Sequence, residues 1–137
     1  MVYVYDTSFV GAVIIPDEKN QRIDKLQKTV GEEEDIFVPQ LFWYEIASVF
    51  NKLIRYERYT FDEVMQFFPY ITEIRLTTDF ETGDVYSQKL LRLSSHYRLS
   101  AYDAAYLELA ERKKAVLCTL DKNLTAAAKN HGVKILA

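Results

Sequence analysis

Residues 2–8 read Val-Tyr-Val-Tyr-Asp-Thr-Ser, and this stretch decides the fold. Its first four residues are β-branched or aromatic, which predicts a buried strand, and the polar residues after them predict a turn. Residues 115–121, Ala-Val-Leu-Cys-Thr-Leu-Asp, repeat the arrangement with a continuous apolar run that ends in Asp121. Short apolar strands separated by helical patterns are typical of a parallel sheet covered on both faces by helices.

The remaining sequence alternates between strand and helix patterns. Residues 36–38 predict a second strand, and Pro39 suits the first turn of a long helix that reaches about Arg58. The apolar face of that helix consists of Phe42, Ile46, Val49, Phe50 and Leu53. The other predicted elements are a helix over 60–68 stopped near Pro69, a strand over 71–76, helices over 80–97 and 101–112, a helix from 122 to a stop at Gly132, and a strand over 133–136. We therefore expect one domain, residues 1–137, of the α/β class, with three α/β/α layers around a central, mainly parallel sheet.

Composition and charge exclude several classes of protein. The formal net charge is −3, so the chain does not hold nucleic acid through a broad basic face, and a phosphate substrate would need a local cation. Cys118 is the single cysteine, which excludes an internal disulfide and a cysteine-ligated zinc site. No apolar stretch approaches the roughly 20 residues of a membrane span, and the N-terminus lacks a basic signal region. We expect a cytoplasmic protein that does not associate with membranes.

Four carboxylates are candidates for a common site: Asp6, Glu45, Asp103 and Asp121. Asp6 and Asp121 each follow a predicted strand, so both fall at the carboxyl edge of the sheet, where ligands of such folds bind. Each acid also has a structural interpretation. Aspartates after strands cap helices, Asp103 could form a capping box with Ser100, and Glu45, among apolar neighbours, could form a buried salt bridge.

A cluster of carboxylates would suit Mg²⁺ or Mn²⁺, which prefer oxygen ligands. The ion would in turn remove the repulsion between the acids that raises their pKa values. Such a centre can activate water for attack on a phosphodiester and stabilise the charge that develops on phosphorus. It would also supply the cation that the composition lacks.

Four segments in order resemble the PIN-domain family, most closely the toxin nucleases of VapBC-type toxin–antitoxin pairs. They are residues 4–8 (VYDTS), 38–41 (VPQL) leading into Glu45, 99–106 (LSAYDAAY) and 119–124 (TLDKNL). The similarity extends over nearly the whole chain. One departure is Tyr97-Arg98, where relatives often have a glycine, so the turn before the Asp103 helix is expected to differ in shape.

The resemblance implies a function as well as a fold. It implies that Asp6, Glu45, Asp103 and Asp121 hold Mg²⁺ or Mn²⁺, and that a hydroxyl residue, Ser8 or Thr119, supports the site. It also implies hydrolysis of RNA, inhibition by an antitoxin whose C-terminal segment wraps the toxin, and a homodimer.

Basic side chains that could meet RNA phosphates are Arg55, Arg58, Lys89, Arg92, Arg98 and Lys122, of which we single out Arg55, Arg98 and Lys122. The alternative is that these residues form ordinary solvated helix faces. His96 and His131 are too few and too far apart for a zinc site, and surface positions are expected for both.

Three other functions compete with an RNA-cleaving toxin. The same metal chemistry would serve a DNA flap nuclease or a nuclease that processes ribosomal RNA. The fold could also be a binding module that holds a partner, with the acids acting only as caps. A phosphoacceptor receiver domain clusters aspartates too, but it needs a lysine at the end of a late strand, where this chain has Thr119 and Asp121.

Overall fold

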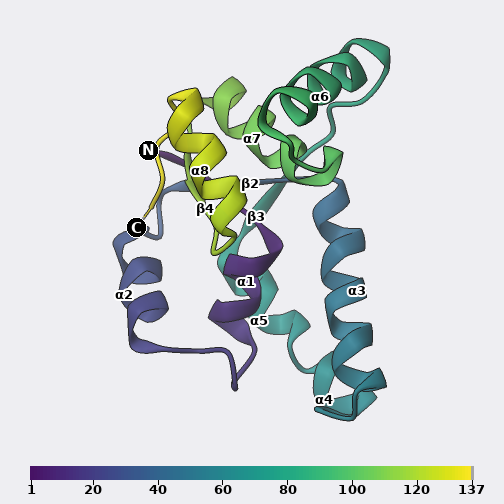
Figure 1. Ribbon diagram of the computed structural model, residues 1–137. Helices are drawn as coiled ribbons and strands as arrows, with labels where there is room; N and C mark the ends of the chain where they lie inside the picture. The colour runs from purple at the N-terminus through teal and green to yellow at the C-terminus, as the bar shows by residue number, and fades with distance from the viewer. Residues whose placement is uncertain (137) are drawn as a thin grey trace.

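The computed structural model describes residues 1–136 and contains within them a parallel sheet of four strands, in the order β3-β2-β1-β4 (Figure 1). The strands are β1 (Val2–Tyr5), β2 (Asp35–Pro39), β3 (Leu76–Asp79) and β4 (Val116–Cys118). The predicted α/β class with a parallel sheet is confirmed. Because β1 lies between β2 and β4, the residues that follow it project from the middle of the sheet's carboxyl edge.

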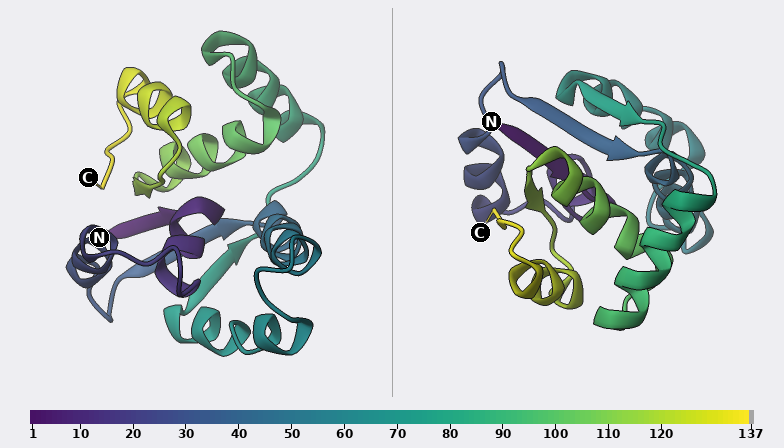
Figure 2. Two further views of the ribbon diagram at one scale, coloured as in Figure 1. Left: turned by 60° about the horizontal axis from the view of Figure 1, so that its bottom comes forward. Right: turned by 90° about the horizontal axis from the view of Figure 1, so that it is seen from above.

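Helices connect the strands and cover both faces of the sheet. In the described part of the chain they are α1 (Thr7–Ile14), α2 (Gln21–Thr29), α3 (Leu41–Arg55), α4 (Phe61–Met65), α5 (Phe68–Ile74), α6 (Asp84–Tyr97), α7 (Ala101–Lys113) and α8 (Lys122–His131). Figure 2 shows α7 and α8 on one side of the sheet and α4 and α5 on the other, so the three layers are confirmed. No helix among residues 1–136 is both long and apolar enough to cross a bilayer.

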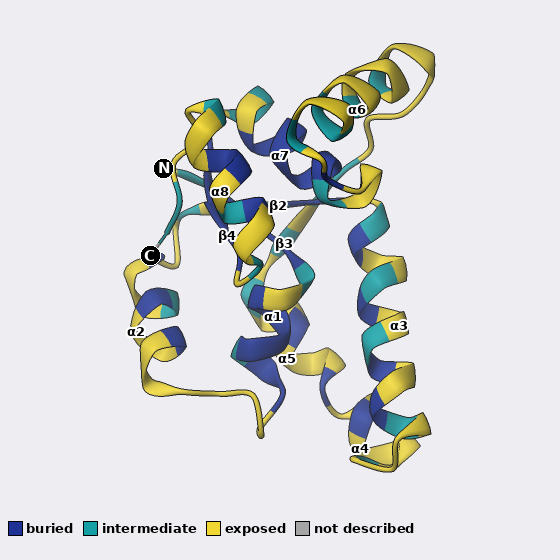
Figure 3. Cartoon of the chain, in the orientation of Figure 1, coloured by how far each residue is buried: buried dark blue, intermediate teal, exposed yellow. Residues whose placement is uncertain are grey.

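The core is densest around β1 and α7. Val4 and Tyr5 are fully buried, and α7 contributes seven consecutive buried residues, 104–110. Helix α6 differs from the other long helices, because none of its residues is buried (Figure 3). It packs mainly on α7 and adds little to the core.

Several predicted boundaries are wrong in the middle of the chain. Pro69, expected to stop a helix, lies instead in the first turn of α5, where its missing N–H costs no hydrogen bond. The strand expected over 71–76 is therefore mostly helical, and β3 begins only at Leu76 after Arg75 turns the chain with φ 62°. Pro39 ends β2 rather than opening α3, and α3 stops at Arg55, before the expected Arg58.

Besides α5, two further helices were not predicted, and the last strand is reduced to a single bridge. The turn expected after β1 is the start of α1, and α2 follows it. Of the strand expected over 133–136, only Ile135 pairs, with Leu117. The departure at Tyr97-Arg98 does not remove the left-handed turn that a glycine would favour, because Arg98 itself adopts φ 56°.

Candidate active site

Asp6 lies at the carboxyl end of β1 and caps helix α1. Its Oδ1 accepts hydrogen bonds from the Phe9 N–H at 3.0 Å and from the Ser8 hydroxyl at 2.7 Å. Its Oδ2 accepts a hydrogen bond from the Thr119 hydroxyl. The capping interpretation is therefore right for Asp6, but a capping bond to one oxygen does not exclude a second role for the same carboxylate.

Asp121 caps helix α8 and is linked to Asp6 through Thr119. The Leu124 N–H donates to Asp121 Oδ1 at 2.8 Å, and the Asp121 N–H donates to Thr119 Oγ1 at 3.0 Å. Since the Thr119 hydroxyl donates to Asp6, this one side chain ties both aspartates together. Ser8 makes a parallel link, because it bonds Asp6 and accepts from the Leu120 N–H at 3.0 Å.

Glu45 projects from the second turn of α3 and is held by two hydroxyl groups. The Tyr106 hydroxyl donates to Glu45 Oε1 at 2.5 Å, and the Thr7 hydroxyl donates to the same oxygen at 3.1 Å. Thr7 and Tyr106 also lie 3.0 Å apart, oxygen to oxygen. The buried salt bridge considered as an alternative is not found: across residues 1–136, Glu45 has no basic partner within 4.0 Å.

Asp103 occupies the first turn of α7, as predicted. The Ser100 hydroxyl caps this helix by accepting a hydrogen bond from the Asp103 N–H at 3.1 Å. The Asp103 carboxyl is half-buried, and burial is the main cause that raises its pKa. The negative charges of Asp121 and Glu45 raise this pKa further, while Ser100 opposes the shift.

The four acids therefore act on one another electrostatically across four elements. Burial, with a smaller contribution from the charge of Asp121, raises the pKa of Asp6 to about 6, even though three hydrogen bonds oppose the shift. Asp103 responds to both Asp121 and Glu45. As the side chains stand, no three His, Cys, Asp or Glu residues in the described chain are arranged as a preformed metal cage.

A family model described as PIN domain matches residues 3–130. The chain belongs to the PIN domain family. A curated relative, Ribonuclease VapC3 from Pyrobaculum aerophilum, is 25% identical over 124 residues, which cover 90% of this chain and 92% of the relative. The family resemblance seen in the sequence is confirmed.

Solved structures support the fold of this PIN domain. The crystal structure of PAE2754 from Pyrobaculum aerophilum matches with a TM-score of 0.71 and 24% identity, covering 99% of this chain and 92% of that one. VapBC2 from Rickettsia felis, solved bound to a DNA fragment from its promoter, matches with a TM-score of 0.69 and 12% identity, covering 98% and 97%. At these identities the likeness concerns the fold.

Two hollows adjoin the carboxylates of the PIN domain. One, of about 390 Å³, lies beside Glu45 and is lined by Thr7, Tyr44, Ser48, Val49, Lys52 and Tyr102. The other, of about 490 Å³, shares Thr7 and Val49 with the first and continues past Ser8 and Gly11 to Leu120. Because they share lining residues, the two form one open trough lined mainly by α1 and α3, in which Tyr44 and Tyr102 are exposed.

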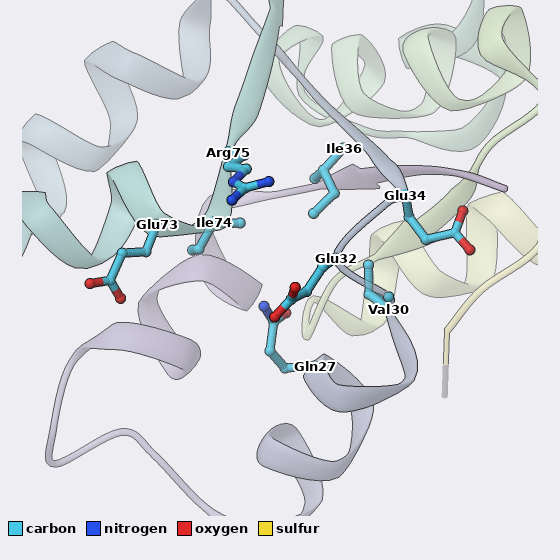
Figure 4. A pocket seen from close by; sticks show the side chains of 9 residues that line it. Gln27, Val30, Glu32, Glu34, Ile36, Glu73, Ile74 and Arg75 are labelled. Carbon is cyan, nitrogen blue, oxygen red and sulfur yellow. The ribbon is translucent and has the colours of Figure 1, made fainter.

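A separate hollow, shown in Figure 4, is lined by none of the four acids. It encloses about 150 Å³ at the amino ends of β2 and β3, and its lining includes Glu32, Glu34, Glu73 and Arg75. In open parallel sheets the opposite, carboxyl edge carries the site. We assign no part of the active site to this hollow.

The basic and histidine residues singled out from the sequence lie in different surroundings. Lys122 directly follows Asp121 at the start of α8, whereas Arg55 lies at the far end of α3 from Glu45. Arg58 is engaged by Asp17 at 2.6 Å. His96 is exposed, as expected, and His131 is partly exposed, with its Nδ1 2.7 Å from the Tyr97 hydroxyl oxygen.

Thr7 and Tyr106 are site residues that were not predicted from the sequence. Both lie within the motifs VYDTS and LSAYDAAY, next to acids that were predicted. Tyr106 lies three residues after Asp103, which places the two side chains on one side of α7. That helical spacing was the available signal, and the general preference of buried tyrosine for a hydrogen-bond partner would have strengthened it.

Proposed function

We propose that this PIN domain is an endoribonuclease that uses Mg²⁺ or Mn²⁺ to hydrolyse phosphodiester bonds of RNA. Asp6, Glu45, Asp103 and Asp121 would hold the metal, and Ser8 and Thr119 would fix Asp6. The observation that carries the proposal is that Thr119 bonds both Asp6 and Asp121, while Asp103 lies near enough to Asp121 and Glu45 for their charges to raise its pKa. The curated relative named a ribonuclease supports RNA as the substrate.

The residues present fit a hard divalent cation. The candidate ligands are carboxylate oxygens, which suit Mg²⁺ and Mn²⁺, and no sulfur or imidazole group is among them. Repulsion contributes to the raised pKa values of Asp6 and Asp103, and a divalent cation would relieve it. Because no cage is preformed in residues 1–136, we expect side-chain rotation of the less restrained acids when the ion binds.

Each residue of the site has a distinct task in this proposal. A bound divalent ion would activate water and stabilise charge on the phosphorus oxygens. Asp6 is held by three donors and would act as the fixed ligand, while Thr119 keeps the Asp121 loop in register with it. Thr7 and Tyr106 orient Glu45, and the open trough admits a strand of RNA.

We further propose that the protein is the toxin of a VapBC-type pair and acts in the cytoplasm. The matching VapBC2 complex supports an antitoxin partner, and the trough beside the acids offers it a binding surface next to the active site. A homodimer stays a prediction. Exposed apolar side chains available for one are Tyr56, Phe61, Met65, Phe68 and Tyr70, at the end of α3 and along α4 and α5. Arg55 and Arg98 also stay predictions as RNA-binding residues.

The deciding experiment is cleavage of a panel of RNAs and single-stranded DNA with Mn²⁺, with Mg²⁺ and with EDTA. We expect RNA cleavage that EDTA abolishes and that Asp103→Asn reduces by at least about a hundredfold, because the variant loses a charged ligand. Asp84→Asn is the matched control, since Asp84 also lies in a helix's first turn but belongs to α6.

Two results would contradict the proposal. Cleavage that persists in EDTA would exclude a metal centre. Full activity in a folded Asp103→Asn protein would exclude the site. Binding of RNA or of a partner protein without cleavage by metal-loaded protein would favour the non-catalytic binding module instead.

A further inference from the structure

A basic groove adjoins the active site between α2 and α8. It has a volume of about 520 Å³, and its lining includes Arg22 from α2, Lys122 and Lys129 from α8, and Thr119, Leu120 and Thr125. Lys122, Thr125 and Lys129 follow the i, i+3, i+7 spacing of one helical face. The groove therefore collects three cations from two elements along one side of α8.

The charges in this groove are not neutralised by the protein. No carboxylate belongs to its lining, and within residues 1–136 none of Arg22, Lys122 and Lys129 forms an ion pair. Other cations of the chain are engaged: Arg58 binds Asp17, and Arg112 binds Asp79. In a protein of net charge −3, this groove is a local site where a polyanion is favoured.

The groove is continuous with the proposed reaction centre. Thr119 lines it and also donates a hydrogen bond to Asp6. Lys122 directly follows Asp121, and Leu120 is shared with the hollow beside Thr7 and Ser8. From Lys122 to Lys129 the groove follows seven residues of helix, about 10 Å, which is enough for a short segment of nucleic-acid backbone.

We propose that Arg22, Lys122 and Lys129 bind the sugar-phosphate backbone of the RNA strand on one side of the bond that is cut. This inference rests on the proposed ribonuclease activity and adds the path of the substrate to it. The carboxylates of the site repel RNA phosphates when no metal is bound. The three cations of the groove offset this repulsion. Lys122 is the member already singled out from the sequence.

The test is RNA binding by the Asp103→Asn protein, which should not cleave the RNA, measured by fluorescence anisotropy at several salt concentrations. We expect Arg22→Gln, Lys122→Gln and Lys129→Gln each to weaken binding several-fold. The triple variant should lower the salt slope by about 0.7 for each phosphate that the protein no longer neutralises. The control is Lys25→Gln with Lys28→Gln, two α2 residues that do not line the groove.

Cleavage assays with proteins that keep Asp103 separate this inference from the proposed function. If the wild-type protein cleaves RNA and the triple variant binds and cleaves it equally well, the groove assignment is overturned and the ribonuclease stands. If the folded wild-type protein cleaves no RNA with either metal, the proposed function fails. The assignment is supported if RNA binding weakens in the groove variants and not in the control, and if the same groove substitutions leave Mn²⁺ affinity unchanged in proteins that keep Asp103.

A second inference comes independently from the contacts of Glu45. Tyr106 is only 2% exposed, and its hydroxyl donates a hydrogen bond to Glu45 Oε1 at 2.5 Å. Three short contacts join the hydroxyl groups of Thr7 and Tyr106 to each other and to Glu45 Oε1. Tyr106 and Thr7 both donate to Glu45 Oε1, and their own oxygen atoms lie 3.0 Å apart.

We infer that Thr7 and Tyr106 are positioning residues that hold Glu45 by Oε1 and leave Oε2 for the metal. Thr7 belongs to α1 and Tyr106 to α7, so Glu45 of α3 is fixed between the helices that carry Asp6 and Asp103. Partners of this kind fix the orientation of a ligand and lower the entropy lost on metal binding. Among residues 1–136, Oε2 accepts no hydrogen bond.

Calorimetric titration with Mn²⁺ tests this role without an activity readout. We expect Tyr106→Phe and Thr7→Val to lower Mn²⁺ affinity about tenfold or more, and Thr7→Ser, which keeps the hydroxyl, to restore it. Tyr5→Phe is the matched control, since Tyr5 is an equally buried tyrosine whose hydroxyl donates to Gln27 at 2.7 Å, away from the acids. Wild-type Mn²⁺ affinity in folded Tyr106→Phe and Thr7→Val would overturn the inference.

Discussion

Asp6 shows how one residue can serve both the fold and the site at a cost in stability. It caps α1, but its carboxyl is 6% exposed, and burial with the charge of Asp121 raises its pKa from 3.8 to about 6. The folded protein without metal therefore binds a proton more tightly than the unfolded chain does. Stability consequently falls as pH rises from about 4 to about 6.

We predict that Asp6→Asn removes this pH dependence. Relative to the wild type without metal, the variant should gain stability progressively between pH 4 and 6 and keep a constant advantage above pH 6. The rise in the pKa of Asp6 from 3.8 to about 6 corresponds to a difference in folding stability of at most about 3 kcal/mol. Asparagine still caps helices, but its amide nitrogen cannot accept a hydrogen bond as the second Asp6 oxygen does, so the change with pH, and not the absolute stability, reports the charge. Urea unfolding in EDTA at several pH values measures the free energy of unfolding of both proteins. If this free energy changes with pH in the same way in both, ionisation of Asp6 does not destabilise the fold.

The candidate acids could be predicted from the sequence, but their surroundings could not. Asp6 and Asp121 follow apolar runs, so their place at the sheet edge depends on local sequence alone. Glu45 drew attention because a charge among apolar neighbours needs a partner. Its partner, Tyr106, lies 61 residues away, and such a contact depends on how α3 and α7 pack.

At the scale of elements, an ion-pair network joins α7 to β3. Arg112 near the end of α7 donates to both oxygens of Asp79 at 3.0 and 2.7 Å and to both oxygens of Glu108 at 3.0 and 2.9 Å. Glu108 is 3% exposed, and among residues 1–136 Arg112 is the basic side chain that forms an ion pair with it. The hydrogen bonds from Arg112, together with its charge, lower the pKa of Asp79.

We predict that Arg112→Met destabilises the protein by about 3 kcal/mol, because it leaves the Glu108 charge buried without a partner. Adding Glu108→Gln should recover part of the loss, since the uncompensated charge is removed. Denaturant unfolding of the single and double variants measures both effects. If the double variant is no more stable than Arg112→Met, the buried charge of Glu108 is not the cause. RNA cleavage should persist in any folded variant, because the network excludes the four acids.

Elements with a one-sided apolar pattern were predictable, and elements buried on several sides were not. Helix α3 has an apolar stripe and was expected close to its observed bounds. Helix α1 has five buried residues out of eight, so its sequence lacks the polar face that marks a helix, and its start depends on the Asp6 cap. Residues 71–74 include three β-branched residues, which favour strands. They are helical here because Pro69 suits the first turn of α5 and because packing outweighs the strand preference.

At the scale of the whole molecule, the site joins segments that are far apart in the chain. Asp6, Glu45, Asp103 and Asp121 start or lie within α1, α3, α7 and α8, and their mutual repulsion opposes the packing of these helices. A divalent ion bound by all four would reverse that effect. The folded state alone presents this arrangement, so metal binding should add directly to the free energy of unfolding.

We predict that Mn²⁺ raises the melting temperature of the wild-type protein and that the effect is lost in Asp103→Asn. At a free Mn²⁺ concentration of one hundred times Kd the stabilisation should be about 2.7 kcal/mol, which for a domain of this size is a rise of several degrees. Without metal, Asp103→Asn should melt at or above the wild-type temperature, because burial and repulsion both disfavour the charge it removes. Asp84→Asn, whose acid is exposed on α6, should respond to Mn²⁺ as the wild type does. A wild-type melting temperature that does not move with saturating Mn²⁺ would contradict this prediction, because a shared ion would then give no relief of the repulsion among the acids, and only the capping roles of Asp6 and Asp121 would remain.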